Sequence, residues 1–185
     1  MSTTRTRRLS RFAILPLAAG LAIGLSAFSA PQAQAATQYC NGCKATIVGT
    51  NGNDDIEGTS GRDVIVGLGG HDELDGNGGN DVICAGSGND EVDGGSGNDY
   101  IHAGSGHDQL EGSSGNDRIY GADGNDHVEG ESGNDTVCGN DGHDLVEGGP
   151  GSDTVSGGAG TDTVKQRYAS EREEDRCEDR YGHDD

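Results

Sequence analysis

Aromatic and apolar residues are scarce in this chain of 185 residues, which has no Trp, two Phe and five Tyr. Only 30% of its residues are hydrophobic, whereas a conventional globular domain draws on about 45–50%. Basic residues are scarce too, because 12 Lys and Arg stand against 33 Asp and Glu, for a formal net charge of −21. A chain this acidic repels nucleic acids and anionic membranes. We therefore expect no nucleic-acid partner and no membrane insertion.

Glycine fills the place of the missing apolar residues and accounts for 35 of the 185 positions. Low hydrophobicity combined with a high net charge is typical of disordered chains. An ordered structure with this composition therefore requires a repeat that buries a small core, or a cation that neutralises the charge.

The first 35 residues differ in composition from the rest of the chain. Four Arg between positions 5 and 11 precede an apolar run over 12–28, and Ala33-Gln34-Ala35 supplies the small residues of a cleavage site. This pattern predicts a signal peptide over 1–35 and a secreted, extracellular protein. A membrane anchor is disfavoured because Pro16 and small residues interrupt the run. Arg7-Arg8 leaves the choice between the general and the twin-arginine export routes open, and the remaining segment 36–185 has a net charge of −25.

The segment 49–165 divides into thirteen nonapeptides without an insertion or deletion. Position four is Gly and position six is Asp in every repeat, position eight is Ile, Leu or Val, and position one is Gly except at Ala85 and Ala103. Self-similarity at a fixed period is the signature of a repeat architecture. The flanks, 36–48 and 166–185, are expected to form an N-terminal cap and a charged C-terminal cap or tail.

The pattern resembles the repeats-in-toxin (hemolysin-type) calcium-binding nonapeptide repeat, G-G-x-G-x-D-x-U-x. It departs from that family at position two, where Thr, Asn, Leu, Ser, Ala or Glu often replaces the second Gly. The resemblance implies calcium ions between the loops of adjacent coils, held by Asp side chains and main-chain carbonyls. It does not extend to the catalytic or pore-forming domains of other members, because no segment here corresponds to one.

Each x-U-x triplet predicts a short strand with U buried, and two loops and two strands make a coil of 18 residues. We expect an all-β fold, a right-handed parallel β-roll of about six and a half coils, with odd and even repeats in separate sheets. Ile56, Leu74 and Val92 would then face Ile65 and Ile83 in a thin core. Glycines at positions one and four are expected to supply the positive φ angles of the loops.

Position six provides the candidate metal ligands. Stacked carboxylates repel one another unless a cation lies between them, and Ca²⁺ takes six to eight oxygen ligands. Seven odd and six even repeats allow at most eleven such sites. The predicted ligands are Asp54, Asp63, Asp72, Asp81, Asp90, Asp99, Asp108, Asp117, Asp126, Asp135, Asp144, Asp153 and Asp162.

The outward positions seven and nine separate the two sheets by charge. Acidic residues gather on the odd repeats, and none of the twelve outward positions of the even repeats is acidic. The even face is either a docking surface, for a protein, a glycan, a second copy or the chain's own ends, or the result of sequence drift. The residues proposed for docking are Val64, Val66, Val82, Tyr100 and Tyr120.

The cysteines suggest disulfides, because the chain is predicted to be exported. We expect Cys138 to pair with Cys177, and Cys84 to pair with Cys43 or Cys40, so that each end of the chain is tied over the even sheet. The competing arrangement is a local Cys40–Cys43 bond. A shared metal site for His71, His107 and His143 is not expected, because successive ones lie two coils apart.

No catalytic constellation is recognisable in the sequence, so an enzyme is not expected. The sequence indicates a secreted calcium-binding structural, surface or matrix module. The alternative is a calcium-dependent binding module for ice or polysaccharide, which would use rows of loop residues such as Ser96 and Asn98 or Ser114 and Asn116.

Overall fold

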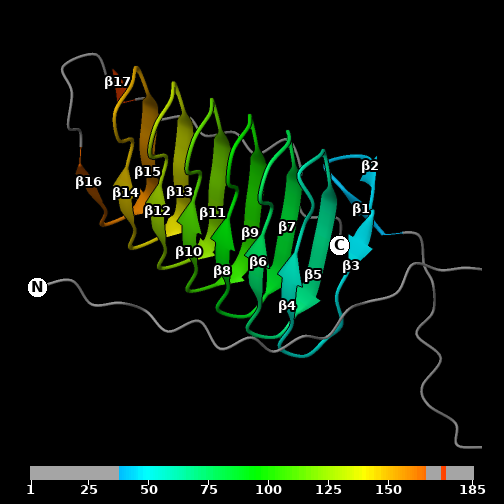
Figure 1. Cartoon of the computed structure of the whole chain (residues 1–185). Coiled ribbons are helices and arrows are strands. Elements are labelled where there is room, and N and C mark those ends of the chain that lie inside the picture. The colour runs from blue at the N-terminus through cyan, green and yellow to red at the C-terminus, as the bar shows by residue number, and fades with distance from the viewer. Residues whose placement is uncertain (1–37, 166–171, 174–185) are drawn as a thin grey trace, which may run out of the picture. The chain divides into compact units, whose positions relative to one another are not determined.

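The structure is a computed structural model that describes residues 38–165 and 172–173. The described part of the chain is all-β and winds into a solenoid in which successive coils stack on one another (Figure 1). None of these residues lies in a helix that could cross a membrane. The segment 1–35, predicted to be a signal peptide, lies outside the described residues.

Two parallel sheets form the roll, one from the odd and one from the even repeats, as predicted. Partners in neighbouring strands are 18 residues apart, so that Leu110 pairs with Val92 and Val128. The odd sheet contains β4 (Asp55–Glu57), β6 (Glu73–Asp75), β8 (Glu91–Asp93), β10 (Gln109–Glu111), β12 (His127–Glu129), β14 (Leu145–Glu147) and β16 (Thr163–Lys165). The even sheet contains β3 (Ile47–Val48), β5 (Val64–Gly69), β7 (Val82–Ser87), β9 (Tyr100–Gly106), β11 (Arg118–Gly124), β13 (Thr136–Gly142), β15 (Thr154–Gly160) and β17 (Arg172–Glu173).

The core is the predicted pair of aliphatic columns. Position eight is buried in every repeat except the last, where Val164 is partly buried at the end of the roll. Ile47 of β3 continues the even column by one residue before the first repeat. Each coil thus contributes about two large apolar side chains, so the core alone offsets little of the backbone ordering cost of about 1–2 kcal/mol per residue.

The expected glycine geometry is right for position four and wrong for position one. Position four has a positive φ in most loops, for example 138° at Gly97 and 151° at Gly106. The second left-handed residue of each loop is position two, from the third repeat to the last. Here even Leu68 and Glu131, with φ of 82° and 63°, adopt a conformation that L-residues avoid. From the third repeat on, replacement of the family's second Gly therefore leaves the loop conformation intact and adds strain.

An N-terminal hairpin of β1 (Tyr39–Cys40) and β2 (Cys43–Lys44) contributes to a second apolar cluster, on the outer side of the even sheet. Cys40 packs there with Val64, Val66 and Val82, which are all buried. These three valines were predicted to line a docking surface, and the occupant in this structure is the chain's own N-terminal segment. The other two residues of that surface, Tyr100 and Tyr120, are half-buried with their ring centroids 5.6 Å apart.

A disulfide joins Cys40 to Cys84, with their Cα atoms 5.8 Å apart, and Cys43 is a free thiol. This bond is one of the two predicted pairings of Cys84, and the competing local Cys40–Cys43 bond is not formed. Cys138 is fully buried and is also in a disulfide. Its predicted partner, Cys177, lies outside the described residues, so the Cys138–Cys177 pairing stays a prediction.

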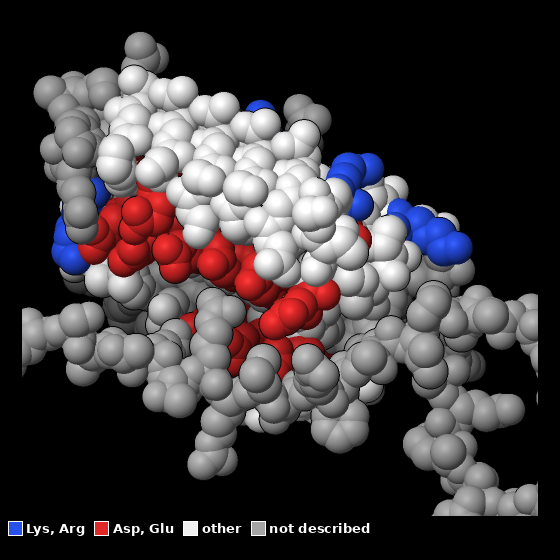
Figure 2. Space-filling view, viewed as in Figure 1, with Lys and Arg blue, Asp and Glu red and all other residues white. Residues whose placement is uncertain are grey.

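The odd sheet presents the expected acidic outer face. Its outward carboxylates follow one another along the roll and appear as a continuous red band in Figure 2. They are Asp55, Glu57, Glu73, Asp75, Glu91, Asp93, Glu111, Glu129 and Glu147. The last of them forms an ion pair with Lys165, which ends the row.

Substitution of position-four glycines tests this loop geometry. A Cβ at Gly106 would collide with the carbonyl oxygen of Gly88 in the preceding coil and would require a disfavoured φ of 151°. We expect Gly106→Ala to lower the free energy of unfolding in saturating calcium by at least about 2 kcal/mol, measured by thermal denaturation. Gly52→Ala is the matched control, because a Cβ there would meet only Thr50 Oγ1 at 3.8 Å. Equal effects of the two substitutions would contradict the stacked-loop geometry.

Candidate metal centre

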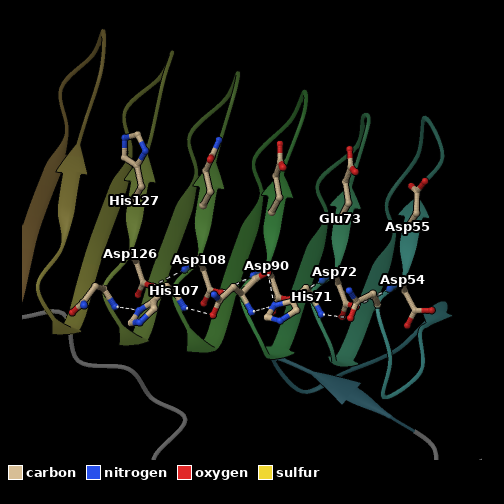
Figure 3. Close-up of a pocket in the computed structure, with 15 residues that line it drawn as sticks. Asp54, Asp55, His71, Asp72, Glu73, Asp90, His107, Asp108, Asp126 and His127 are labelled. Atoms are coloured by element: carbon tan, nitrogen blue, oxygen red, sulfur yellow. Dashed lines mark hydrogen bonds between the residues drawn. The ribbon is translucent and has the colours of Figure 1, made fainter. Parts of the chain in front are cut away.

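The position-six aspartates lie in two columns, one along each edge of the roll, where the loops turn between the sheets. Nine of them have a loop stacked on both sides and are almost fully buried, with Asp81 and Asp117 only 1% exposed. Of the four at the ends of the columns, Asp63 and Asp153 are buried, and Asp54 and Asp162 are half-buried. Figure 3 shows five members of the odd column, from Asp54 to Asp126, in a row along the edge. The structure thus brings all thirteen predicted residues into two arrays.

One carboxylate oxygen of each aspartate contributes to coil stacking. The backbone N–H of every position-six residue except the last on each edge donates to Oδ1 of the Asp one coil further on, as from Asp99 to Asp117 at 2.8 Å. Eleven such hydrogen bonds join the loops, six on the odd edge and five on the even edge. They equal the number of junctions between adjacent loops, which is also the upper limit on sites obtained from the sequence.

The other carboxylate oxygen is buried and has no hydrogen-bond partner in ten of the thirteen loops. A buried, unpaired carboxylate oxygen is strongly unfavourable unless a proton or a cation neutralises it. The ten aspartates are Asp72, Asp81, Asp90, Asp99, Asp108, Asp117, Asp126, Asp135, Asp144 and Asp153. Their regular recurrence indicates a shared requirement for a positive partner.

The space beside this Oδ2 atom accounts for the preference for Gly at position one. A Cβ at Gly112 would lie 2.8 Å from both Asp117 Oδ2 and the carbonyl oxygen of Gly130 in the next coil. At Gly76 the corresponding distances are 2.8 Å to Asp81 Oδ2 and 2.5 Å to the carbonyl oxygen of Gly94. At these two loops Gly is required by close approach and not by a positive φ, although Ala85 and Ala103 fill position one in two other repeats. A carboxylate oxygen and a carbonyl oxygen face this space, and both are ligands that hard cations such as Ca²⁺ prefer.

Burial raises the pKa of these carboxyls above the ordinary 3.8. The pKa rises to about 7 in Asp99, Asp108 and Asp135 and to about 6 in Asp126. Desolvation is the largest cause, the hydrogen bond to Oδ1 opposes it, and repulsion from stacked aspartates adds to it. Without a cation the folded roll thus resists full ionisation of its central loops.

Position five forms a third repeating feature that the sequence analysis missed. On the odd edge each side chain accepts the backbone N–H of the position-five residue one coil on, so Asn53 accepts from His71 and His71 Nδ1 accepts from Asn89. The same ladder continues through His107 and His143. These histidines accept the same backbone N–H that asparagine accepts in the alternate coils. The regular alternation of Asn and His was the signal available in the sequence.

An open groove follows the odd edge beside this ladder (Figure 3). It is lined by positions five to seven of the first five odd repeats, including His71, Asp72 and Glu73. A separate group of possible metal ligands, His127, Glu129 and Glu147, lies on the outer odd face within the described residues. Its members already pair locally, His127 with Glu129 at 2.8 Å and Glu147 with Lys165.

Comparison with known families identifies the repeat. The family model described as "RTX calcium-binding nonapeptide repeat" matches in four copies, over residues 48–83, 85–110, 102–137 and 139–164. Together these copies span more than half of the 185 residues. No curated protein matches the chain significantly.

The raised pKa values predict how the calcium-free roll responds to pH. Since the folded state binds these protons more tightly than the unfolded chain, the stabilisation is complete below about pH 4 and is lost as the pH rises through about 6–7. Circular dichroism in calcium-free buffer should therefore show more β signal at pH 5 than at pH 8. In saturating calcium the melting midpoint should instead be lower at pH 5 than at pH 8, because protons compete with the cation for the same oxygens. A calcium-free β signal that rises between pH 5 and 8 would contradict this account.

Proposed function

Because the chain belongs to the RTX calcium-binding nonapeptide repeat family, we propose that it is a calcium-dependent structural module whose roll folds as cations bind between its loops. Repeats of this family bind calcium. The observation that carries the proposal for this chain is the set of ten buried Oδ2 atoms without hydrogen-bond partners, arranged in two columns. A structural cation at each junction would neutralise them.

We assign the ligands to the position-six aspartates and to nearby carbonyl oxygens. The ten aspartates with unpaired Oδ2 atoms would bind cations, and Asp54, Asp63 and Asp162 border the terminal junctions. Eleven junctions set the upper limit at eleven Ca²⁺, whose +22 nearly balances the −25 of segment 36–185. The cation supplies charge and coordination, and the loops exclude water from the carboxylates. The proposed role is structural and includes no catalytic step.

Export would bring the chain into the conditions that such a role needs. The predicted signal peptide over 1–35 would direct secretion, and the Cys40–Cys84 disulfide fits an oxidising compartment. We therefore propose a secreted or surface-associated protein whose calcium-binding coils stay unfolded before export, where calcium is scarce, and fold outside. Contacts with a protein, a glycan or a second copy would involve the even face beyond the N-terminal hairpin.

The alternative, a calcium-dependent binding module for ice or polysaccharide, depends on rows of exposed loop polar groups. On the even edge, however, Asn116 Nδ2 donates to Asn98 Oδ1 at 3.0 Å, and Asn134 Nδ2 donates to Asn116 Oδ1 at 3.1 Å. Each Oδ1 also accepts a backbone N–H from the next coil. These amides therefore stabilise the stack, and fewer of their groups face a ligand, which favours the structural role.

Calcium removal is the direct test of the proposal. The full chain in a calcium chelator at pH 7.5 should lose most of its β signal in circular dichroism, and millimolar Ca²⁺ should restore it. Loss is expected because neither the thin core nor protonation at this pH offsets the ordering cost and the charge. A chain that keeps its complete β signal in the chelator would contradict the proposal.

A pair of substitutions in one loop distinguishes the loss of a calcium ligand from a general loss of negative charge. Asp126→Asn removes the charge of a buried carboxylate whose Oδ2 is unpaired, whereas Asp123→Asn makes the same change at an exposed position three residues earlier. Calorimetric titration should show one or two fewer calcium ions per chain for Asp126→Asn and a several-fold higher calcium midpoint for folding. Asp123→Asn should keep the wild-type stoichiometry. Similar losses in both variants would show that calcium responds only to net charge.

A further inference from the structure

The first loop on each edge differs from all later loops in how its aspartate is held. The hydroxyl and the N–H of Thr50 donate to Asp54 Oδ2 at 3.0 and 2.6 Å. Thr59 does the same for Asp63 Oδ2, at 2.8 and 2.7 Å. These two Oδ2 atoms thus have two donors each, whereas the ten described above have none. Threonine at position two thus supplies the hydrogen-bond donors that Oδ2 lacks in those ten loops.

The backbone of these two loops differs in the same way. Positive φ at position two begins only at Leu68, in the third repeat, and positive φ at position four begins only at Gly70. The position-four residues Gly52 and Gly61 have open space at the Cβ position, because their nearest neighbours are the hydroxyls of Thr50 and Thr59 at 3.8 and 3.9 Å. In the first two loops the threonine hydroxyl therefore forms the hydrogen bonds of the turn, and positions two and four do not adopt the left-handed conformation found in the later loops.

A third threonine, Thr46, contacts the even edge from the segment before the first repeat. Thr46 is one coil before Val64, and its hydroxyl donates to Asp63 Oδ1 at 3.3 Å and accepts the N–H of Val64 at 2.8 Å. In later coils that Oδ1 accepts the N–H of a preceding aspartate. Both oxygens of Asp63 thus have protein donors.

A second apolar cluster also lies at this end. Strand β5 is buried on both faces, since Val64 and Val66 lie under the N-terminal segment while Ile65 lies in the core. In β9 and β11 the outward side chains are only half-buried or exposed. The Cys40–Cys84 disulfide ties the same segment to β7. Stability here depends less on the neutralisation of the loop carboxylates.

We propose that residues 38–66, together with β7, form a calcium-independent cap, in which Thr50 and Thr59 replace the cation at Asp54 and Asp63. The later coils would add to this cap as calcium binds, so folding would proceed from the N-terminal end. This inference rests on the proposed function, because it assigns which loops of the same site do without the cation.

Hydrogen–deuterium exchange of the full chain, followed by mass spectrometry in chelator and in saturating calcium, tests the cap. In chelator we expect slow exchange in peptides that cover 46–66 and 82–84. There the N–H of Thr46 donates to the carbonyl oxygen of Val64, and the N–H of Val82 donates to the carbonyl oxygen of Asp63. Peptides from β9 to β15 should exchange at the rate of an unfolded chain. In calcium all of these strands should be protected.

Conservative variants test the threonines themselves. Thr50→Val with Thr59→Val should increase the exchange rate of the 46–66 peptides in chelator at least tenfold and leave protection in calcium intact. Thr136→Val, on the outer side of β13, is the matched control and should change neither. Wild-type exchange rates of the double variant in chelator would overturn the role of the threonines.

The outcomes also separate this inference from the proposed function. If the whole chain exchanges freely in chelator and is protected in calcium, the cap is overturned and the calcium-dependent roll stands. If all strands are protected in chelator, the proposed function itself fails, whatever the threonine variants show.

Discussion

The repulsion between stacked, buried aspartates is the constraint on which the rest of the structure depends. Parallel, in-register coils place identical residues about 4.8 Å apart, so a single Asp per repeat becomes a column of carboxylates. Burial removes the water that would screen them, as the raised pKa of Asp108 reflects. The glycines at position one leave room beside most of these Oδ2 atoms, where a positive partner would offset the repulsion between the carboxylates.

This repulsion also bears on the thin core and on the contrast between the two sheet faces. Small aliphatic columns form a thin core beneath thirteen acidic loops. Outward acids on the odd sheet keep the assembled roll hydrated, whereas the even sheet accepts apolar packing at its N-terminal end. Under the proposed function the roll requires cations along its length, and its N-terminal end is stabilised in addition by the Cys40–Cys84 disulfide, threonine hydroxyls and two-sided burial.

The repeat made much of this predictable. A strict period of nine predicts the 18-residue coil, the two sheets, the position-eight core and the columns of Asp, because in-register stacking converts sequence identity into spatial alignment. The assignment of positive φ to position one was wrong, since Gly is required both for backbone conformation and for close approach, and composition does not distinguish them. Thr50 and Thr59 were recognisable only as departures from Gly at position two, because their hydrogen bonds depend on a loop conformation that only the three-dimensional structure reveals. The choice of Cys40 over Cys43 likewise depends on the path of a non-repetitive hairpin.

Anomalous diffraction from crystals grown with calcium tests the central claim most directly, because it locates the cations without reference to stability. The account predicts two columns of peaks, one along each edge, next to the Oδ2 atoms of Asp72 to Asp153 and repeating every coil of about 4.8 Å. Peaks confined to the acidic outer face of the odd sheet, with none beside these buried oxygens, would contradict it.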